Sequence, residues 1–144
     1  MREEFYKRRS NELRVAKVFW IAFLGGVPFY FFLLYYLKSI NATATLNPEI
    51  LSTFAILLGF VGALDLVFAF YYPRIIQKFR KDLPPWHSVY IIRLALVEAI
   101  AIYGLLIGFM GANWEFAIPF FIASGGGIFL LYPSEEKLGI SKSL

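Results

Sequence analysis

Three charged side chains interrupt the long apolar stretches of this chain: Asp65, Arg93 and Glu98. An ionisable group inside an apolar helix is costly unless it is paired, protonated or wetted. Residues of this kind either bind and release protons or small cations, or hold helices together through hydrogen bonds and ion pairs. They are therefore the candidate functional residues of this sequence.

Glu98 lies near the middle of the apolar run 88–110, roughly 15 Å from its start at a rise of about 1.5 Å per residue. It lies about 140° around the helix from Arg93, so the guanidinium is not expected to neutralise it fully. A protonated Glu98 can hydrogen-bond a neighbouring helix, and a titrating Glu98 can carry a proton or a small cation. The sequence leaves both interpretations open.

Asp65 and Arg93 have opposite charges and similar expected depths. At about 1.5 Å per residue, Asp65 lies roughly 10 Å from the end of its apolar run at Tyr72. Arg93 lies roughly 7–8 Å from the start of the next run at Ser88. A short connection joins the two runs, so we expect antiparallel helices and a buried Asp65–Arg93 ion pair, with a structural role favoured over transport.

The helices that must position these residues are visible as four apolar runs, each near the twenty or so residues that cross a bilayer. The sequence predicts an all-α integral membrane protein in which four transmembrane helices form an antiparallel up-down bundle. The chain, 1–144, is expected to be a single membrane domain. Its basic N-terminal segment 1–17 lies on the membrane surface or extends the first span, and 133–144 form a tail. The predicted spans are about 18–37, 50–72, 88–110 and 114–132.

The placement of lysine and arginine predicts the orientation. The connections after the first and third runs contain Lys38 as their only basic residue, beside Glu49 and Glu115. By the positive-inside rule both termini are cytoplasmic, in the inner or plasma membrane of a prokaryote, where the basic segments face anionic lipid headgroups. The remaining basic residues, outside Arg93, are Arg2, Lys7, Arg8, Arg9, Arg14, Lys17, Arg74, Lys78, Arg80, Lys81, Lys137 and Lys142.

Composition excludes several classes of function. The chain is 59% hydrophobic, with a net charge of +4 and no cysteine. Without cysteine, and with His87 as its single histidine, we expect no disulfide, no metal site and no cofactor. The basic residues flank apolar runs, so we expect lipid rather than nucleic acid as their partner. No phosphate loop or catalytic triad is present, so we expect no enzymatic activity.

Small residues line one face of each of the two central runs. Gly104 and Gly108 share a face in the third run, and Ala55, Gly59 and Gly62 form a stripe in the second. Small residues let helices approach closely in a membrane. The two stripes are expected to meet and form a tight central hairpin.

The stretch 95–105, with Glu98 followed five positions later by Tyr103-Gly, resembles the carboxylate helix of rotary ATPase proteolipid subunits. The resemblance implies that Glu98 carries the coupling ion and that Tyr103 supports it by a hydrogen bond. The chain departs from that family in its second run, where bulky residues such as Phe60 replace a glycine ladder, and at Ala99, where the sodium-binding form has a hydroxyl. Otherwise the chain looks like a small four-span prokaryotic membrane protein, and it is loosely similar to assembly proteins encoded with ATP synthases.

Two functions follow as hypotheses from different classes. In the first, the protein is a non-enzymatic packing or assembly subunit of a membrane complex or a homo-oligomer. In the second, it transports protons or a small cation, with Glu98 as the titrating site. Asn41-Ala-Thr43 also matches a glycosylation sequon in a connection expected to be external, and its interpretation as an unmodified polar loop is preferred.

Overall fold

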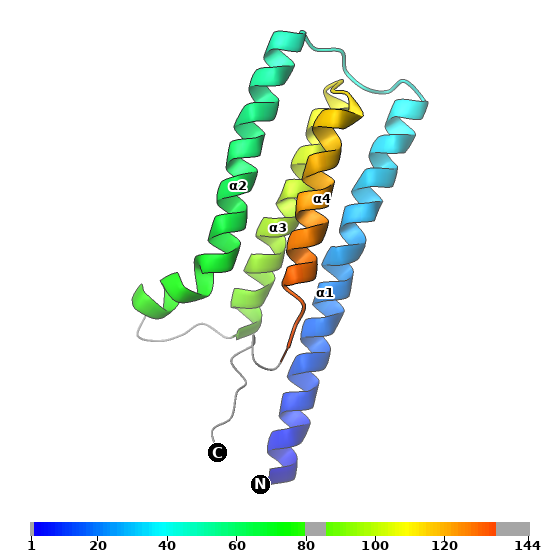
Figure 1. Ribbon diagram of the computed structural model, residues 1–144. Coiled ribbons are helices and arrows are strands. Elements are labelled where there is room, and N and C mark those ends of the chain that lie inside the picture. Colours follow the sequence, from blue (N-terminus) through cyan, green and yellow to red (C-terminus); the bar gives the residue numbers. More distant parts are fainter. Residues whose placement is uncertain (1, 80–85, 135–144) are drawn as a thin grey trace.

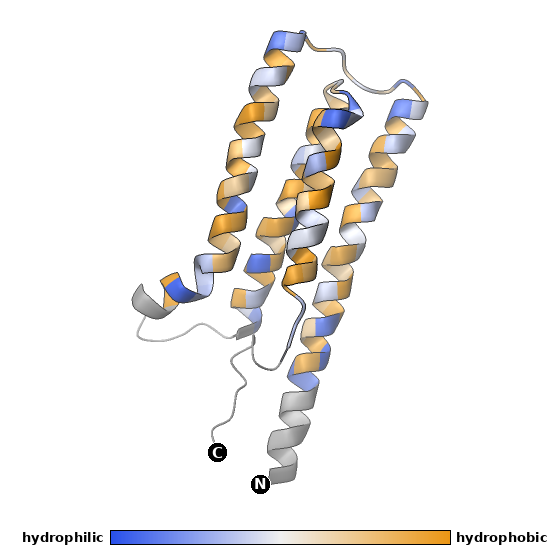
Figure 2. Cartoon of the chain, viewed as in Figure 1, coloured by the Kyte–Doolittle hydropathy of each residue, from blue (hydrophilic) through white to orange (hydrophobic). Residues whose placement is uncertain are grey.

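The computed structural model describes residues 2–79 and 86–134, which form four helices and their connections. Three helices contain segments that are long and apolar enough to cross a membrane: Asn11–Ser39, Pro48–Ile76 and His87–Phe109. The fourth is a shorter apolar helix. Figure 2 shows hydrophobic residues along most of each helix, with hydrophilic residues gathered toward the ends. The helices are α1 (Arg2–Ser39), α2 (Pro48–Phe79), α3 (Trp86–Phe109) and α4 (Trp114–Leu130).

Each predicted apolar run corresponds to one helix, but two helices are longer than predicted. α1 begins at Arg2, so the basic segment 1–17 continues into the first apolar run without a break. α2 continues beyond Pro73 to Phe79, and Figure 1 shows it turning aside near its C-terminal end, as expected for a helix with an internal proline. The connection 80–85 and the part of the predicted tail from residue 135 onward lie outside the described residues.

α3 is the central helix of the bundle, because it packs against α1, α2 and α4 (Figure 1). α1 also packs against α4, whereas α2 approaches α4 only slightly. In the described part of the chain no Cα atom of α1 lies within 8 Å of a Cα atom of α2. The largest fully buried side chains of the described residues come from α1, α3, α4 and the segment that follows α4, and none comes from α2. Among them are Leu34, Leu94, Val97, Ile107 and Ile128.

The small residues of α2 and α3 do not meet in the way the sequence suggested. Gly62 of α2 packs against Ile100 of α3, but Gly104 packs against α4. Gly108 packs against Leu34 of α1. Because α3 has neighbours on three sides, its small residues pack against different helices. The prediction that the two stripes of small residues meet in a tight hairpin is therefore corrected.

The two ends of the bundle differ in charge. We call the end that carries Arg14, Lys17 and Arg74 the basic end. The opposite end, with Glu49 and Glu115 in the first turns of α2 and α4, is called the acidic end. Positive charge from α1 and negative charge from α2 and α4 therefore lie near opposite ends of the same bundle.

At the acidic end, the connection between α1 and α2 lies against the turn between α3 and α4. The backbone N–H of Ala44 donates to the carbonyl of Phe109 at 2.8 Å. Gly111 has φ +101°, and a Cβ at this position would overlap the carbonyl oxygen of Ala44. Lys38 Nζ donates to the carbonyl of Ala112. These contacts therefore join the α1–α2 connection to the α3–α4 turn at the acidic end.

Candidate functional site: two tyrosine–carboxyl pairs on either side of α3

Glu98 lies on the side of α3 that faces α1. Tyr30 Oη donates a hydrogen bond to Glu98 Oε1 at 3.3 Å. Gly26, one turn before Tyr30 and so on the same face of α1, provides the space for this carboxyl, because a Cβ at Gly26 would overlap Glu98 Oε1. At the adjacent Gly25 a Cβ would meet nothing within 4 Å. α1 therefore supplies both the donor and the opening that accommodate Glu98.

Tyr103 binds the other carboxyl. Its Oη donates to Asp65 Oδ2 at 2.8 Å and so joins α3 to α2. The expectation that Tyr103 supports Glu98 is corrected, because Tyr30 takes that place. Five residues separate Glu98 from Tyr103, which puts them about 140° apart around the helix, so they face different neighbours.

Arg93 binds a backbone carbonyl. Its Nε donates to the carbonyl oxygen of Ala69 at 2.8 Å. Proline has no N–H, so Pro73 cannot donate to the carbonyl four residues earlier, which is that of Ala69. A freed carbonyl in an apolar environment needs another donor, and the partly buried Arg93 supplies it.

The predicted Asp65–Arg93 ion pair is corrected, since no ion pair joins these two residues in the described structure. Ala69, which Arg93 reaches, is one turn from Asp65, or roughly 6 Å along the helix. Side chains in a helix lean toward its N-terminus. Asp65 on α2 therefore leans toward the acidic end and Tyr103, while Arg93 on α3 leans toward the basic end, so the two charges diverge.

The two carboxyls occupy one layer of the bundle. Gly62, one turn before Asp65, packs against Ile100 of α3. Asp65 therefore lies level with the turn of α3 that contains Glu98, on the opposite side of that helix. The described residues contain no group of three histidine, cysteine, aspartate or glutamate side chains that could hold a metal ion. Each carboxyl is instead one half of a carboxyl–phenol pair, which can link two helices or exchange a proton.

Ser124 is a third polar residue near this layer. Its side chain is fully buried on α4, and its Oγ has no hydrogen-bond partner in the described chain. Gly127, one turn farther along α4, packs against Val97 of α3. Ser124 is therefore within about one helical turn of Glu98 in depth. A buried hydroxyl without a partner costs about 1–3 kcal/mol.

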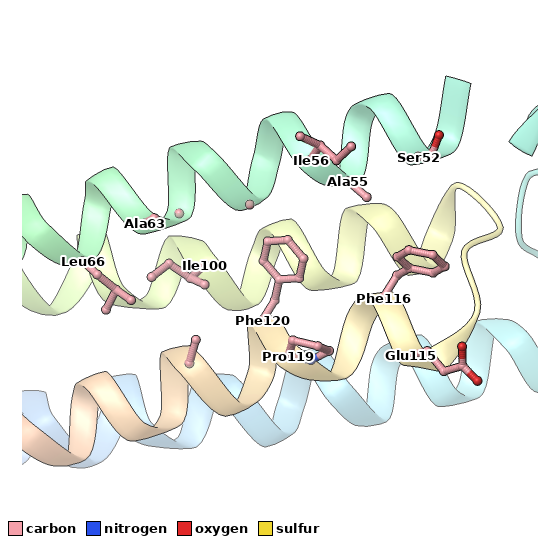
Figure 3. Close-up of a pocket in the computed structure, with 13 residues that line it drawn as sticks. Ser52, Ala55, Ile56, Ala63, Leu66, Ile100, Glu115, Phe116, Pro119 and Phe120 are labelled. Carbon is pink, nitrogen blue, oxygen red and sulfur yellow. The ribbon is translucent and has the colours of Figure 1, made fainter. Parts of the chain in front are cut away.

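Two cavities lie on the α2 side of the bundle, and neither is lined by a residue of the pairs above. The first, which we call the groove, has a volume of about 490 Å³ and runs between α2 and α4 with Ile100 of α3 at its base (Figure 3). The second, which we call the end pocket, has a volume of about 310 Å³ and lies at the acidic end. Both are lined by Ser52 and Phe116, so they are adjacent.

Sequence reasoning missed the α1 half of the Glu98 site. Gly26 and Tyr30 are spaced by four residues, so they share a helix face, and this spacing was a usable signal. The sequence did not show which face of α1 points at α3. The bond of Arg93 had a stronger signal, because Pro73 identifies the carbonyl of Ala69 as needing a donor.

None of the family models, curated proteins or solved structures compared with the chain matches it.

Proposed function

We propose that this chain is a small, non-enzymatic integral membrane protein that serves as a packing or assembly subunit of a membrane complex or homo-oligomer. It crosses the inner or plasma membrane four times as an antiparallel bundle, with both termini cytoplasmic. The three long apolar helices support this proposal. At roughly 25 Å from its 17 residues, α4 is near the shortest length that can cross a bilayer.

One observation carries the proposed function: Asp65, Arg93 and Glu98, the three charged residues that interrupt the apolar runs, each bond to a neighbouring helix. Glu98 links α3 to α1, while Asp65 and Arg93 each link α2 to α3. Bonds of this kind hold helices together in a membrane, where apolar side chains gain little by leaving lipid.

The test of a structural Glu98 is Glu98→Gln beside Glu98→Leu. The amide of glutamine still accepts the Tyr30 hydrogen bond, so Glu98→Gln should keep the thermal stability of the purified protein and of any complex it forms. Leucine cannot accept this bond, so Glu98→Leu should lower stability by about 0.5–1.5 kcal/mol. If both variants are as stable as the wild type, the Tyr30–Glu98 bond holds nothing together and the structural role fails.

A second candidate is transport of protons or a small cation through Glu98. It is favoured by one specific observation, the unpartnered and buried Ser124 Oγ near the depth of Glu98. A serine oxygen, the Tyr30 phenol and a carboxylate are all oxygen ligands for a proton or a hard cation. This arrangement also agrees with the resemblance of residues 95–105 to the ion-carrying helix of proteolipid subunits.

Ion flux into liposomes that contain the purified protein tests this candidate. Wild-type flux of protons or sodium that is abolished by Glu98→Gln, with the fold intact, would establish transport and remove the packing role as the main function. A carbodiimide that modifies buried protonated carboxyls gives an independent measurement, because sodium should protect Glu98 only if it binds there. Absence of flux under proton and sodium gradients, without sodium protection, would leave the packing role.

A further inference from the structure

The groove and the end pocket together have the form of a site for an amphiphile. The groove is almost entirely apolar, and the rings of Phe116 and Phe120 project from α4 toward α2 (Figure 3). The end pocket is more polar, and its lining includes Ser52 and Asn113. Because the two cavities share residues, a molecule with an apolar tail and a polar head can occupy both at once.

We propose that this site binds one zwitterionic phospholipid with an amine headgroup, such as phosphatidylethanolamine. One acyl chain lies in the groove between α2 and α4, and the headgroup lies in the end pocket at the acidic end. The proposal is independent of whether the protein packs in a complex or transports an ion, because it uses none of the residues that bond to Glu98.

The apolar part of the site is formed by small residues of α2 that face the rings of α4. Ala55, Gly59 and Ala63 line the α2 wall, and a Cβ added at Gly59 would be in van der Waals contact with the ring of Phe120, at 3.9 Å. The slight contact between α2 and α4 leaves this wall open. In a bilayer such an opening faces hydrocarbon, so a lipid chain is the molecule present to fill it.

The groove is long and narrow, as a lipid chain requires. From Ser52 to Leu66 it extends roughly 20 Å along α2 at about 1.5 Å per residue. The cavity volume is about 490 Å³. A single acyl chain is a narrow file of methylenes and can follow a groove of this length.

The charges around the site select the headgroup. Neither cavity is lined by lysine, arginine or histidine. Glu115 lines the groove but not the end pocket, and it is next to Phe116, which lines both cavities. Its negative charge at this end of the bundle favours an ammonium group over an anionic headgroup. Lys38, the basic residue near this end, donates to Ala112 and lies 5.1 Å from the centre of the Trp114 ring. An amine headgroup therefore fits better than an anionic one.

Asn113 supplies a hydrogen-bond donor for the phosphate of such a headgroup. It is the N-cap residue of α4, but its side chain makes no capping bond. It is exposed and lines the end pocket, so its amide is directed neither into the helix nor into the core. The positive end of the α4 dipole at the same place adds to the attraction for phosphate.

The experiment reconstitutes the protein in vesicles that contain equal amounts of phosphatidylethanolamine and phosphatidylglycerol, then extracts it and measures retained lipid by native mass spectrometry. The wild type should retain one phosphatidylethanolamine. Ala63→Phe should abolish this retention by filling the groove. Ala22→Phe is the matched control, because Ala22 is an exposed residue of α1 that lines neither cavity.

Headgroup selection is tested by Glu115→Gln, which should lower the ratio of retained phosphatidylethanolamine to phosphatidylglycerol roughly fivefold. Glu49→Gln removes the same charge at the same end, but Glu49 lines neither cavity and its substitution should leave the ratio unchanged. Equal retention of both lipids by the wild type would overturn the headgroup assignment. Extraction without lipid as a dimer, with Ala63→Phe monomeric, would overturn the proposal in favour of a second copy. Circular dichroism verifies that each variant is folded.

Discussion

At the scale of single residues, Gly26 and Gly25 are adjacent in α1 but have opposite surroundings. Alanine at position 26 would overlap the Glu98 carboxyl, whereas alanine at position 25 would contact nothing within 4 Å. We expect Gly26→Ala to lower the free energy of unfolding by about 1–3 kcal/mol, because the carboxyl must move away from Tyr30. Gly25→Ala should be neutral or slightly stabilising, since alanine favours the helix.

Thermal unfolding of the two glycine variants in the same detergent tests this expectation. The contrast between neighbouring positions controls for any general effect of adding a methyl group to α1. Equal melting temperatures would mean that the Glu98 carboxyl does not lie against Gly26.

The Asp65–Tyr103 hydrogen bond predicts an energetic coupling between these two residues. The sequence alone predicted a coupling between Asp65 and Arg93. In a double-mutant cycle of Asp65→Leu and Tyr103→Phe, we expect a coupling free energy of about 0.5–1.5 kcal/mol, because either substitution alone removes the same hydrogen bond. A second cycle, of Asp65→Leu with Arg93→Leu, should be additive because these side chains bond to different partners. A large coupling free energy in the second cycle would instead support an ion pair between Asp65 and Arg93.

The sequence identified the carboxyl residues of the site, but it did not identify their hydrogen-bond partners. Glu98 and Asp65 are identifiable because charges are rare in apolar runs. Their partners depend on how each helix is rotated about its axis and which helices are neighbours. Tyr30 lies far from Glu98 in sequence. Gly26 and Tyr30 share a face of α1, but this helix has apolar and aromatic residues on most sides, so the sequence does not show which face meets α3.

At the scale of helices, Pro73 and Arg93 act as one unit across two elements. Arg93→Leu should destabilise the protein by about 1–3 kcal/mol, because the carbonyl of Ala69 then loses its donor. Pro73→Ala restores a backbone N–H that can bond this carbonyl within α2. In the Pro73→Ala background we therefore expect Arg93→Leu to cost less, by about 1 kcal/mol.

Chemical unfolding of the four proteins in this cycle measures the difference. Pro28→Ala in α1 is the control, because Pro28 lies on a different helix from Ala69 and should leave the cost of Arg93→Leu unchanged. If Pro28→Ala and Pro73→Ala act alike, the bond between Arg93 and Ala69 does not depend on the proline.

Helix positions were predicted well from apolar runs, and helix ends less well. The runs identified all four helices because hydropathy varies over whole segments. α1 begins earlier than its run, since the charged residues before it are good helix formers. α2 passes through Pro73 because Arg93, on another helix, binds the carbonyl that the proline frees. That compensation cannot be seen in the sequence of α2.

At the scale of the whole molecule, the proposed orientation predicts the labelling of single cysteines. The chain contains no cysteine, so an introduced thiol is unique. Ala42→Cys at the acidic end should react with an impermeant reagent added outside the cell, and Asn11→Cys at the basic end should react only after the membrane is opened. Both positions are exposed, so burial does not account for a difference. The reverse pattern would contradict the positive-inside argument.

The lack of contact between α1 and α2 has a consequence for how this sequence can evolve. Substitutions on helices whose backbones do not approach each other have nearly additive effects, so a change in α1 needs no compensating change in α2. Every other helix packs on α3, so changes there are felt on three sides at once. We therefore expect related sequences to vary independently in their first and second helices, and to preserve the third by correlated changes in all of its neighbours.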